Sequence, residues 1–222
     1  MSHLINMIQL SKQPIGIFGG TFDPIHLGHL QVANEVYKQL NLKEIRFIPC
    51  KQSPLKNQSP IASETDRLEM IKLAISDRPY FFTDDREIKR SGVSYTVDTL
   101  KSLRKEYPDT PLCFIMSMDS FIQFNLWHKW KEIIQLTHLI ITNRNNTNNP
   151  ANKEILYLLK KCKISEKKSL LNNLVGKIYF LNILPCDISG TKIRILLKNG
   201  GNVREMLSPT VLEYIQRYRL YC

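Results

Sequence analysis

Long hydrophobic runs are missing from this chain of 222 residues, and no stretch approaches the roughly 20 apolar residues of a membrane-spanning helix. Residues 1–13 also lack the charged start, long apolar core and small-residue cleavage site of a signal peptide. We therefore expect a cytoplasmic protein that does not enter a membrane. Residues 1–13 are interpreted as a short leader into the first strand.

Cysteine is sparse, and its spacing excludes several kinds of site. The five cysteines are scattered, odd in number and nowhere arranged as CxxC, which argues against a disulfide framework and a cysteine-based zinc site. Reduced, buried thiols are expected instead, and the apolar segments around Cys50 and Cys113 favour this. Two nearby histidines, described below, have no third ligand at suitable spacing, so we predict no metal site in the protein itself.

Acidic residues are too few to balance the basic ones. The chain has 20 Asp and Glu against 31 Lys and Arg, a net charge of +11 and a pI of about 9.4. Such a charge is typical of nucleic-acid-binding proteins. Part of the excess lies in the Asn- and Lys-rich stretch 143–177, however, and a binder of small polyanions also benefits from a basic surface. The charge alone leaves both classes open.

Apolar, β-prone runs alternate with segments of helical period along the rest of the chain. The predicted strands are 15–18, 45–49, 80–83, 112–117, 138–142 and 177–182. The predicted helices are 27–40, 63–75, 96–107, 130–136, 153–162, 191–198 and 209–218. Because the strands are apolar without alternation, we predict an α/β fold, a Rossmann-like doubly wound parallel sheet. We expect one domain over 1–222, with a surface loop at 143–152 and a small C-terminal helical part at 188–222.

The stretch GGTFDPIHLGH, residues 19–29, follows the first apolar run directly. Gly19 and Gly20 allow a sharp turn and a close approach of backbone to ligand. His26 and His29 stand three residues apart at the start of the next helix, so both rings can face one spot. A helix N-terminus offers free N–H groups and the positive end of the dipole. We predict a strand–turn–helix phosphate site that differs from GxGxxG and GxxxxGK[ST], both of which are absent.

A second candidate phosphate site is ISGTKIR, residues 188–194. Ser189 is a plausible N-cap, Thr191 adds a hydroxyl at the helix start, and Arg194 follows one turn later. This helix N-terminus could hold phosphate from the side opposite the histidines. A capped helix with a solvated arginine is the alternative interpretation.

These two motifs resemble those of a known enzyme superfamily. GGTFDPIHLGH looks like the GGTFDPxHxGH signature of nucleotidylyltransferases, and ISGTKIR is similar to their ISSTxIR element. Three further segments, EIKRSGVSYTVDTL (87–100), MDSFIQFNLWHKW (118–130) and LSPTVLEYIQRYRLY (207–221), resemble the bacterial nicotinate-mononucleotide adenylyltransferases. The likeness covers most of the chain outside the first dozen residues and 143–175.

The resemblance implies transfer of AMP from ATP, with its Mg²⁺, to nicotinate mononucleotide, giving nicotinate adenine dinucleotide and pyrophosphate. The attacking group is a phosphate oxygen that is already ionised, so the site has to align two anions and stabilise charge rather than activate a nucleophile. An in-line reaction without a covalent intermediate is expected. The catalytic residues implied are His26, His29 and Arg194, with Arg194 on the β- and γ-phosphates.

The other implied site residues fall into two groups. The ATP-binding residues are Gly19, Gly20, Thr21, Phe22, Lys56, Asp119, Ser189 and Thr191, with Lys51 as a weaker candidate. The mononucleotide-binding residues are Tyr95, Thr96, Trp127 and His128, with Trp127 stacked on the pyridine ring and Thr96 at its carboxylate. Trp130 is interpreted as a core residue. The chain departs from the family pattern at Ser117 and Gly190, and it has NNTNNP where a Pro-Gly-aromatic turn is common.

Several alternatives remain at this point. Another adenylyltransferase of the superfamily, acting on nicotinamide mononucleotide or phosphopantetheine, is the nearest. A basic nucleic-acid-binding protein would show salt-sensitive binding to DNA or RNA. A nucleotide-binding module that has lost catalysis is opposed by the intact His26, His29 and Arg194. The sequence predicts no nucleic-acid partner for an enzyme of this class, and it leaves the oligomeric state open.

Overall fold

The computed structural model describes residues 13–52, 54, 59–143, 152–184 and 186–222. Within these ranges, seven parallel strands form one sheet in the order β3-β2-β1-β4-β5-β7-β6. The strands are β1 (Ile15–Gly20), β2 (Glu44–Pro49), β3 (Phe81–Thr83), β4 (Leu112–Ser117), β5 (His138–Asn143), β6 (Lys163–Ile164) and β7 (Ile178–Asn182). The helices are α1 (Leu27–Leu40), α2 (Glu64–Ile75), α3 (Arg86–Lys89), α4 (Thr96–Glu106), α5 (Met118–Ile122), α6 (Trp130–Ile133), α7 (Lys153–Cys162), α8 (Lys168–Leu171), α9 (Gly190–Lys198) and α10 (Pro209–Arg217).

The predicted parallel α/β sheet with a helical C-terminal part is confirmed, and α1, α7 and β4 have the predicted bounds. The sequence prediction missed β6, the helices α3, α5 and α8, and a 3-10 turn at Phe124–Leu126. These elements are at most five residues long, too short to show a repeating pattern of their own. The helix predicted at 130–136 ends at Ile133, and residues 134–136 form turns. Most of the predicted leader and of the predicted loop at 143–152 lies outside the described residues.

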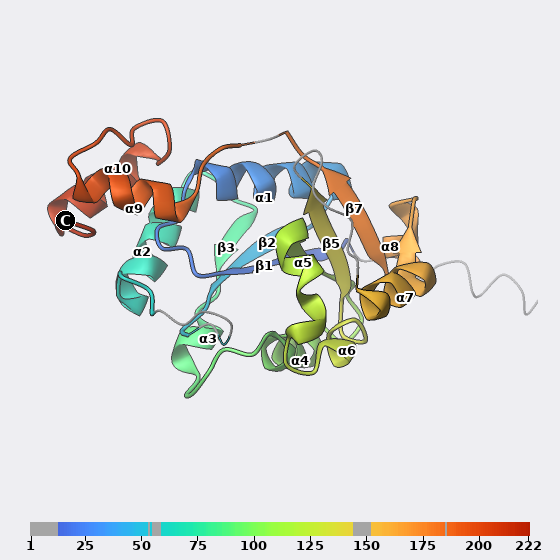
Figure 1. Ribbon diagram of the computed structural model, residues 1–222. Coiled ribbons are helices and arrows are strands. Elements are labelled where there is room, and N and C mark those ends of the chain that lie inside the picture. The colour runs from blue at the N-terminus through green and yellow to red at the C-terminus, as the bar shows by residue number, and fades with distance from the viewer. Residues whose placement is uncertain (1–12, 53, 55–58, 144–151, 185) are drawn as a thin grey trace, which may run out of the picture.

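Helices cover both faces of the sheet. Successive residues of each strand point to opposite faces, and because most of the strand residues are apolar, both faces have to be covered. In β4, Cys113 and Ile115 pack in the core that contains α1 and α2. Leu112, Phe114 and Met116 pack in the core that contains α4 and α6. Figure 1 shows α1 above the sheet and α4 and α6 below it.

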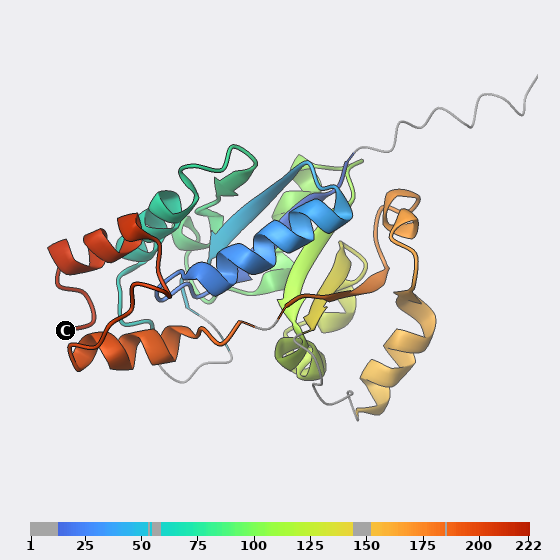
Figure 2. The ribbon, with the colours of Figure 1, turned by 90° about the horizontal axis from the view of Figure 1, so that it is seen from above.

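The last helix, α10, packs against α2 at one end of the sheet (Figure 2). The Tyr214 hydroxyl in α10 donates to the Asp66 carboxylate at 3.0 Å, and the Thr210 hydroxyl donates to the Leu73 carbonyl at 3.3 Å. Val211 and Ile215, on the inner side of α10, are buried. This packing brings the start of α9 next to the loop that follows β1.

The middle of the sheet contains a topological switch point. Strand β1 pairs with β2 on one side and with β4 on the other. The chain leaves β1 through α1 on one face and enters β4 from α4 on the other face. Ligands of open parallel sheets bind beyond the carboxyl ends of the strands at such a point. The motif 19–29 begins at this position, where Gly20 pairs with Pro49.

Candidate active site

The loop after β1 closes tightly over a buried aromatic ring. Phe22 has a positive φ of 50°, and its side chain is 2% exposed. Its ring makes edge contacts with Phe18 and His29, at centroid distances of 5.6 and 5.0 Å. A Cβ on Gly20 would lie 3.0 Å from the Phe22 ring, so a larger residue would disrupt this packing. The Phe22 side chain belongs to the core, and only its backbone can face a ligand.

The two histidines of the motif are stacked at the start of α1. Their ring centroids are 3.7 Å apart with an interplanar angle of 26°. The two rings therefore lie together on one side of the helix start, as the three-residue spacing predicted. His26 is 5% exposed and His29 is half-buried. The His26 backbone N–H donates to His29 Nδ1 at 3.3 Å, which places the ring proton of a neutral His29 on Nε2. A Cβ on Gly28 would lie 3.1 Å from His26 Nδ1, so the glycine makes room for the stack.

Asp23, between the glycines and the histidines, makes contacts with three distant segments, at residues 61–62, 194 and 221. Its carboxylate accepts the backbone N–H of Ile61 at 2.9 Å and of Ala62 at 3.1 Å. The same carboxylate accepts the Tyr221 hydroxyl at 2.7 Å. Burial and the Asp23 carboxylate hold the pKa of Tyr221 above its usual range. Sequence reasoning missed Asp23 as a site residue, because Ile61, Ala62 and Tyr221 lie 38, 39 and 198 positions away in the chain.

Helix α9 carries the second motif and reaches Asp23 through Arg194. Arg194 Nη1 donates to the Asp23 carbonyl at 2.6 Å and lies 3.9 Å from its carboxylate. Arg194 Nη2 donates to the Thr191 hydroxyl at 3.3 Å, and the side chain is 27% exposed. Ser189 caps the helix, accepting the Lys192 N–H at 3.2 Å, as predicted. The structure therefore brings the two predicted motifs together.

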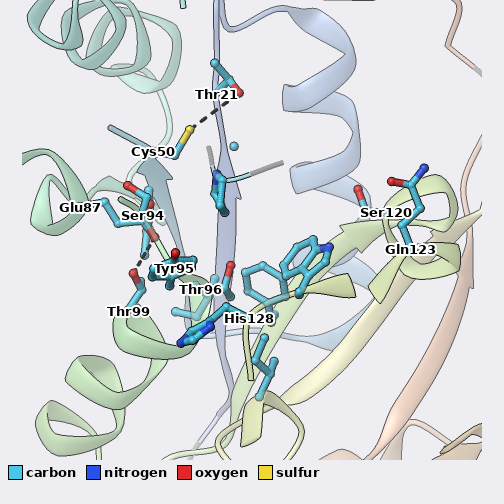
Figure 3. Close-up of a pocket in the computed structure, with 18 of the residues that line it drawn as sticks. Thr21, Cys50, Glu87, Ser94, Tyr95, Thr96, Thr99, Ser120, Gln123 and His128 are labelled. Atoms are coloured by element: carbon cyan, nitrogen blue, oxygen red, sulfur yellow. Dashed lines mark hydrogen bonds between the residues drawn. The ribbon is translucent and has the colours of Figure 1, made fainter. Parts of the chain in front are cut away.

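A cavity of about 450 Å³ opens at the carboxyl ends of β1, β2 and β4. Figure 3 shows Thr21 and Cys50 at one end and Tyr95, Thr96 and His128 at the other. The predicted site residues that line it are Gly19, Gly20, Thr21, Tyr95, Thr96, Asp119, Trp127 and His128. The lining does not include His26, His29, Ser189, Thr191 or Arg194, which lie on α1, α9 and the residues that precede these helices.

Aromatic side chains form the end of the cavity next to α4. The rings of Tyr95 and His128 have centroids 4.3 Å apart. Trp127 makes edge contacts with Phe114 and Phe124 at 6.0 and 5.6 Å and also lines the cavity. Thr96 is the first residue of α4, so free backbone N–H groups of a helix N-terminus lie beside these rings. Trp130, which does not line the cavity, packs on Phe124, in agreement with its predicted core role.

A buried carboxyl group supports the loop that carries Tyr95 and Thr96. Glu87 accepts the Thr99 hydroxyl at 2.6 Å, and Arg90 donates to the same hydroxyl oxygen at 3.1 Å. Burial raises the pKa of Glu87, while hydrogen bonds from Thr99 and Ser94 and the charge of Arg90 act in the opposite direction. Glu87 lines the cavity, yet nothing in its spacing marked it as a site residue.

The remaining candidates on this side have distinct surroundings. Asp119 is exposed in the first turn of α5, which Ser117 caps by accepting the Ser120 N–H at 3.3 Å. Lys51 Nζ lies 4.0 Å from the Glu64 carboxylate. Lys56 lies outside the described residues.

Cys50 is only half-buried and lines the cavity, which corrects the expectation that it is a core thiol. All five cysteines are thiols that belong to no disulfide, as the sequence predicted.

The described residues show neither a metal cluster nor a membrane span. No three His, Cys, Asp or Glu side chains within those ranges are grouped so that they could hold a metal ion. The same part of the chain has no helix long and apolar enough to cross a membrane.

Comparison with known proteins identifies close relatives over almost the whole chain. The profile of the "Cytidylyltransferase-like" family matches residues 17–195. A protein of Aeromonas hydrophila named "Probable nicotinate-nucleotide adenylyltransferase" is 41% identical over 210 residues, which cover 95% of this chain and 98% of the relative. A Coxiella burnetii protein of the same name is 44% identical over 210 residues, covering 93% of this chain and 97% of the relative.

The fold also has a counterpart among solved structures. The Plasmodium falciparum nicotinic acid mononucleotide adenylyltransferase complexed with NaAD superposes with a TM-score of 0.73. The match covers 94% of this chain and 97% of the other, at 22% identity. This likeness, at low identity, extends the comparison to the three-dimensional fold.

Proposed function

Because the chain belongs to the nicotinate-nucleotide adenylyltransferases, a family of cytidylyltransferase-like proteins, we propose that it transfers AMP from ATP to nicotinate mononucleotide. A phosphate oxygen of the mononucleotide attacks the α-phosphorus of ATP, and the bond from that phosphorus to the pyrophosphate oxygen breaks. The products are nicotinate adenine dinucleotide and pyrophosphate. The reaction is a step of NAD biosynthesis.

One observation carries this proposal, the continuity of two chemically different ends of one site. The phosphate end consists of residues 19–29 with Arg194. The pyridine end consists of Tyr95, Thr96, Trp127 and His128. The cavity runs from Gly20 and Thr21 to the pyridine end. A dinucleotide has a matching layout, with anionic phosphates joined to a flat aromatic ring.

At the phosphate end, the groups are donors held in place before substrate arrives. His29 Nε2 carries a proton, and the start of α1 offers backbone N–H groups and the positive end of its dipole. Donors arranged in advance stabilise the charge that develops on the phosphates in the transition state. His26, stacked on His29, extends this arrangement. The reacting phosphate is already anionic, so no protein nucleophile is required.

Arg194 supplies the second cation of the phosphate end. Its Nη1 is anchored on the Asp23 carbonyl, which leaves part of the guanidinium exposed for the β- and γ-phosphates of ATP. Ser189 and Thr191 at the start of α9 add an N-terminal dipole and a hydroxyl on the same side. Gly19, Gly20, Thr21 and Phe22 contribute backbone, and Asp119 is assigned to the ribose of ATP. Lys51 and Lys56 stay candidates for further phosphate contacts.

The pyridine end provides the selectivity for the mononucleotide. Trp127 offers an aromatic face, and the hydroxyl of Thr96 with the N–H groups that begin α4 suits a carboxylate. The ring pair of Tyr95 and His128 closes this end. We assign the nicotinate ring and its carboxylate to these four residues.

Mg²⁺ enters with ATP in this proposal. The described residues provide no cluster of carboxylates or imidazoles for a resident ion, and Mg²⁺ commonly binds through substrate phosphates and water. No step is therefore assigned to a metal held by the protein alone. Cytoplasmic location and the absence of a nucleic-acid partner stay predictions.

Pyrophosphate release tests this function. The protein would be incubated with ATP and Mg²⁺ and with nicotinate mononucleotide, the nicotinamide form or 4′-phosphopantetheine, each over a range of concentrations. We expect strong preference for the acid mononucleotide. Equal use of acid and amide would retain the reaction class but discard the assignment of Thr96 and Trp127 to the carboxylate and ring. No turnover of either pyridine nucleotide by the folded protein would overturn the proposal.

A further inference from the structure

Arg67, in the first turns of α2, is a charged residue that is completely buried. Its exposed fraction is 0%. Its Nη1 donates to the Thr21 carbonyl at 2.7 Å and to the Cys50 carbonyl at 2.8 Å. Thr21 directly follows β1, and Cys50 directly follows β2, so one guanidinium nitrogen holds the ends of two neighbouring strands together. The mechanism above assigns this residue no role.

The surroundings of Arg67 are unusual for a buried cation. Buried charges are generally paired with an opposite charge, since desolvation is costly. Among the described residues, no carboxylate lies within 4 Å of this guanidinium, and its Nε and Nη2 have no hydrogen-bond partner. A neutral donor could satisfy the same two carbonyl groups without the cost of burying a charge. Its charge is therefore better explained by a task at the adjacent anion site.

The contact with Thr21 orients the phosphate loop. In a planar trans peptide, the C=O and the following N–H point in opposite directions. The Thr21 carbonyl points at Arg67, so the Phe22 N–H points away from it. Thr21 itself lines the cavity, on the strand–turn–helix segment assigned to phosphate. By holding the Thr21 carbonyl, Arg67 thus fixes the direction of the Phe22 N–H, a backbone donor of the phosphate end.

The contact with the Cys50 carbonyl connects Arg67, through further hydrogen bonds, to the loop of the pyridine end. The Cys50 carbonyl points at Arg67, and the Lys51 N–H on the opposite side of that peptide donates to the Ser94 hydroxyl at 3.0 Å. The Ser94 N–H donates to the Gln52 carbonyl at 3.1 Å, which completes a two-bond link. Ser94 lines the cavity and immediately precedes Tyr95 and Thr96 (Figure 3).

We propose that Arg67 is a positioning residue, which sets the phosphate loop and the Ser94–Thr96 loop relative to each other so that the two bound anions meet in line. The proposal rests on the adenylyl transfer proposed above. Arg67 does not line the cavity, so the proposal assigns it no contact with either substrate. Its effect is transmitted by the two carbonyl groups, and its positive charge favours the anions bound on the far side of the loop.

Arg104 provides a matched control at the opposite end of the sheet. Its guanidinium also binds backbone carbonyls, with Nη1 on Tyr107 at 2.9 Å and Thr110 at 2.8 Å, and Nη2 on Leu136 at 2.7 Å. It does not line the cavity. Loss of either arginine frees carbonyl groups, but only loss of Arg67 should disturb the two loops of the site.

The experiment compares Arg67→Met, Arg67→Lys and Arg104→Met with the wild type. For Arg67→Met we expect kcat to fall about 10²-fold, because a small misplacement of aligned reactants has an effect of this size. Arg67→Lys retains the charge but loses the planar guanidinium, so it should recover part of this loss. Arg104→Met should keep the wild-type kcat. An unchanged kcat in both folded Arg67 variants would overturn the proposal.

Amide hydrogen exchange gives a second readout that needs no turnover. Exchange at residues 20–22 and at residues 94–96 should accelerate together in the Arg67 variants and stay unchanged in Arg104→Met. If Arg67→Met fails to fold, Arg67→Lys decides both readouts, and wild-type kcat with wild-type exchange in that variant would overturn the proposal. A wild type that exchanged normally but formed no dinucleotide would instead overturn the proposed function, while the exchange comparison would still decide whether Arg67 links the loops.

Discussion

At the phosphate end, Asp23 gathers hydrogen bonds from Ile61, Ala62, Arg194 and Tyr221, whereas at the pyridine end the rings of Tyr95 and His128 meet only by packing. The first arrangement is directional and largely buried, and it uses backbone and charge. The second is aromatic and partly exposed, and its residues lie at the start of α4 and just after the short 3-10 turn Phe124–Leu126.

This difference corresponds to two tasks. Charge that develops on phosphate is stabilised only by donors held at the right positions, so rigidity at the phosphate end contributes directly to rate. Recognition of a flat ring depends on apolar contact area and tolerates small shifts. We therefore expect changes at the phosphate end to lower kcat and changes at the pyridine end to raise KM for the mononucleotide. The predictions below test that division.

The largest effect is expected for His29→Ala. Loss of one positioned donor typically lowers kcat about 10²- to 10³-fold. Steady-state pyrophosphate release would measure this loss, and thermal unfolding would show that the fold survives. His128→Ala at the pyridine end is the matched control and should mainly change KM for the mononucleotide. An unchanged kcat in His29→Ala would contradict the assignment of kcat to the phosphate end.

A titration far from both ends should affect stability but not substrate preference. At the start of β5, His138 Nε2 donates to the Asn173 carbonyl at 2.9 Å, and Nδ1 accepts the Lys177 N–H at 3.1 Å. Burial lowers the pKa of His138 from 6.5 to about 4. The unfolded chain therefore takes up a proton below pH 6.5, while the folded protein does not until about pH 4.

This depressed pKa supports stability that is fully present above pH 6.5 and is lost as the pH falls toward 4. The difference between 6.5 and about 4 corresponds to about 3 kcal/mol. Urea unfolding across this range would show a steep loss in the wild type and a shallower one in His138→Gln. Equal pH slopes in the two proteins would contradict the assignment of this loss to His138.

Trp127→Ala tests the pyridine end with a smaller expected effect. Aromatic contacts are worth about 0.5–1.5 kcal/mol, so KM for nicotinate mononucleotide should rise up to about tenfold. KM for ATP and kcat should change little, and Trp127→Phe should restore most of the affinity. A fall in kcat at unchanged KM would show that the ring end also aligns the reacting groups, and the division of tasks would then need revision.

Tyr221→Phe is expected to have the smallest effect, and on stability. It removes the hydroxyl that donates to Asp23 but leaves the Ile61 and Ala62 N–H groups on the carboxylate. Loss of one such hydrogen bond costs about 1 kcal/mol in the free energy of unfolding. Tyr218→Phe, at an exposed position of the same segment, is the control. A large fall in kcat without a loss of stability would show that the C-terminal segment acts in catalysis.

Local signals in the sequence determined the order of all but the shortest elements, and the two motif helices. The apolar runs became the strands of the parallel sheet, and the predicted cap Ser189 does accept an N–H group of the helix that it precedes. The three-residue spacing of His26 and His29 was enough to predict that both rings face one spot, since helical geometry places such residues on one face. The structure adds that the two rings stack. These features depend on neighbours within one or two turns of the chain.

Only the tertiary structure decided which distant segments meet at the site. Asp23 and Arg194 are 171 residues apart and Asp23 and Tyr221 are 198 apart, and no periodicity marks such pairs. In the sequence, nothing distinguishes Arg67 from another polar residue of an amphipathic helix. Its role follows only from the sheet order, which places β1 and β2 side by side and brings the ends of both strands to its guanidinium. Contacts of this kind depend on how the sheet is wound and on which helix faces it, and these follow from the packing of the whole core rather than from any local pattern.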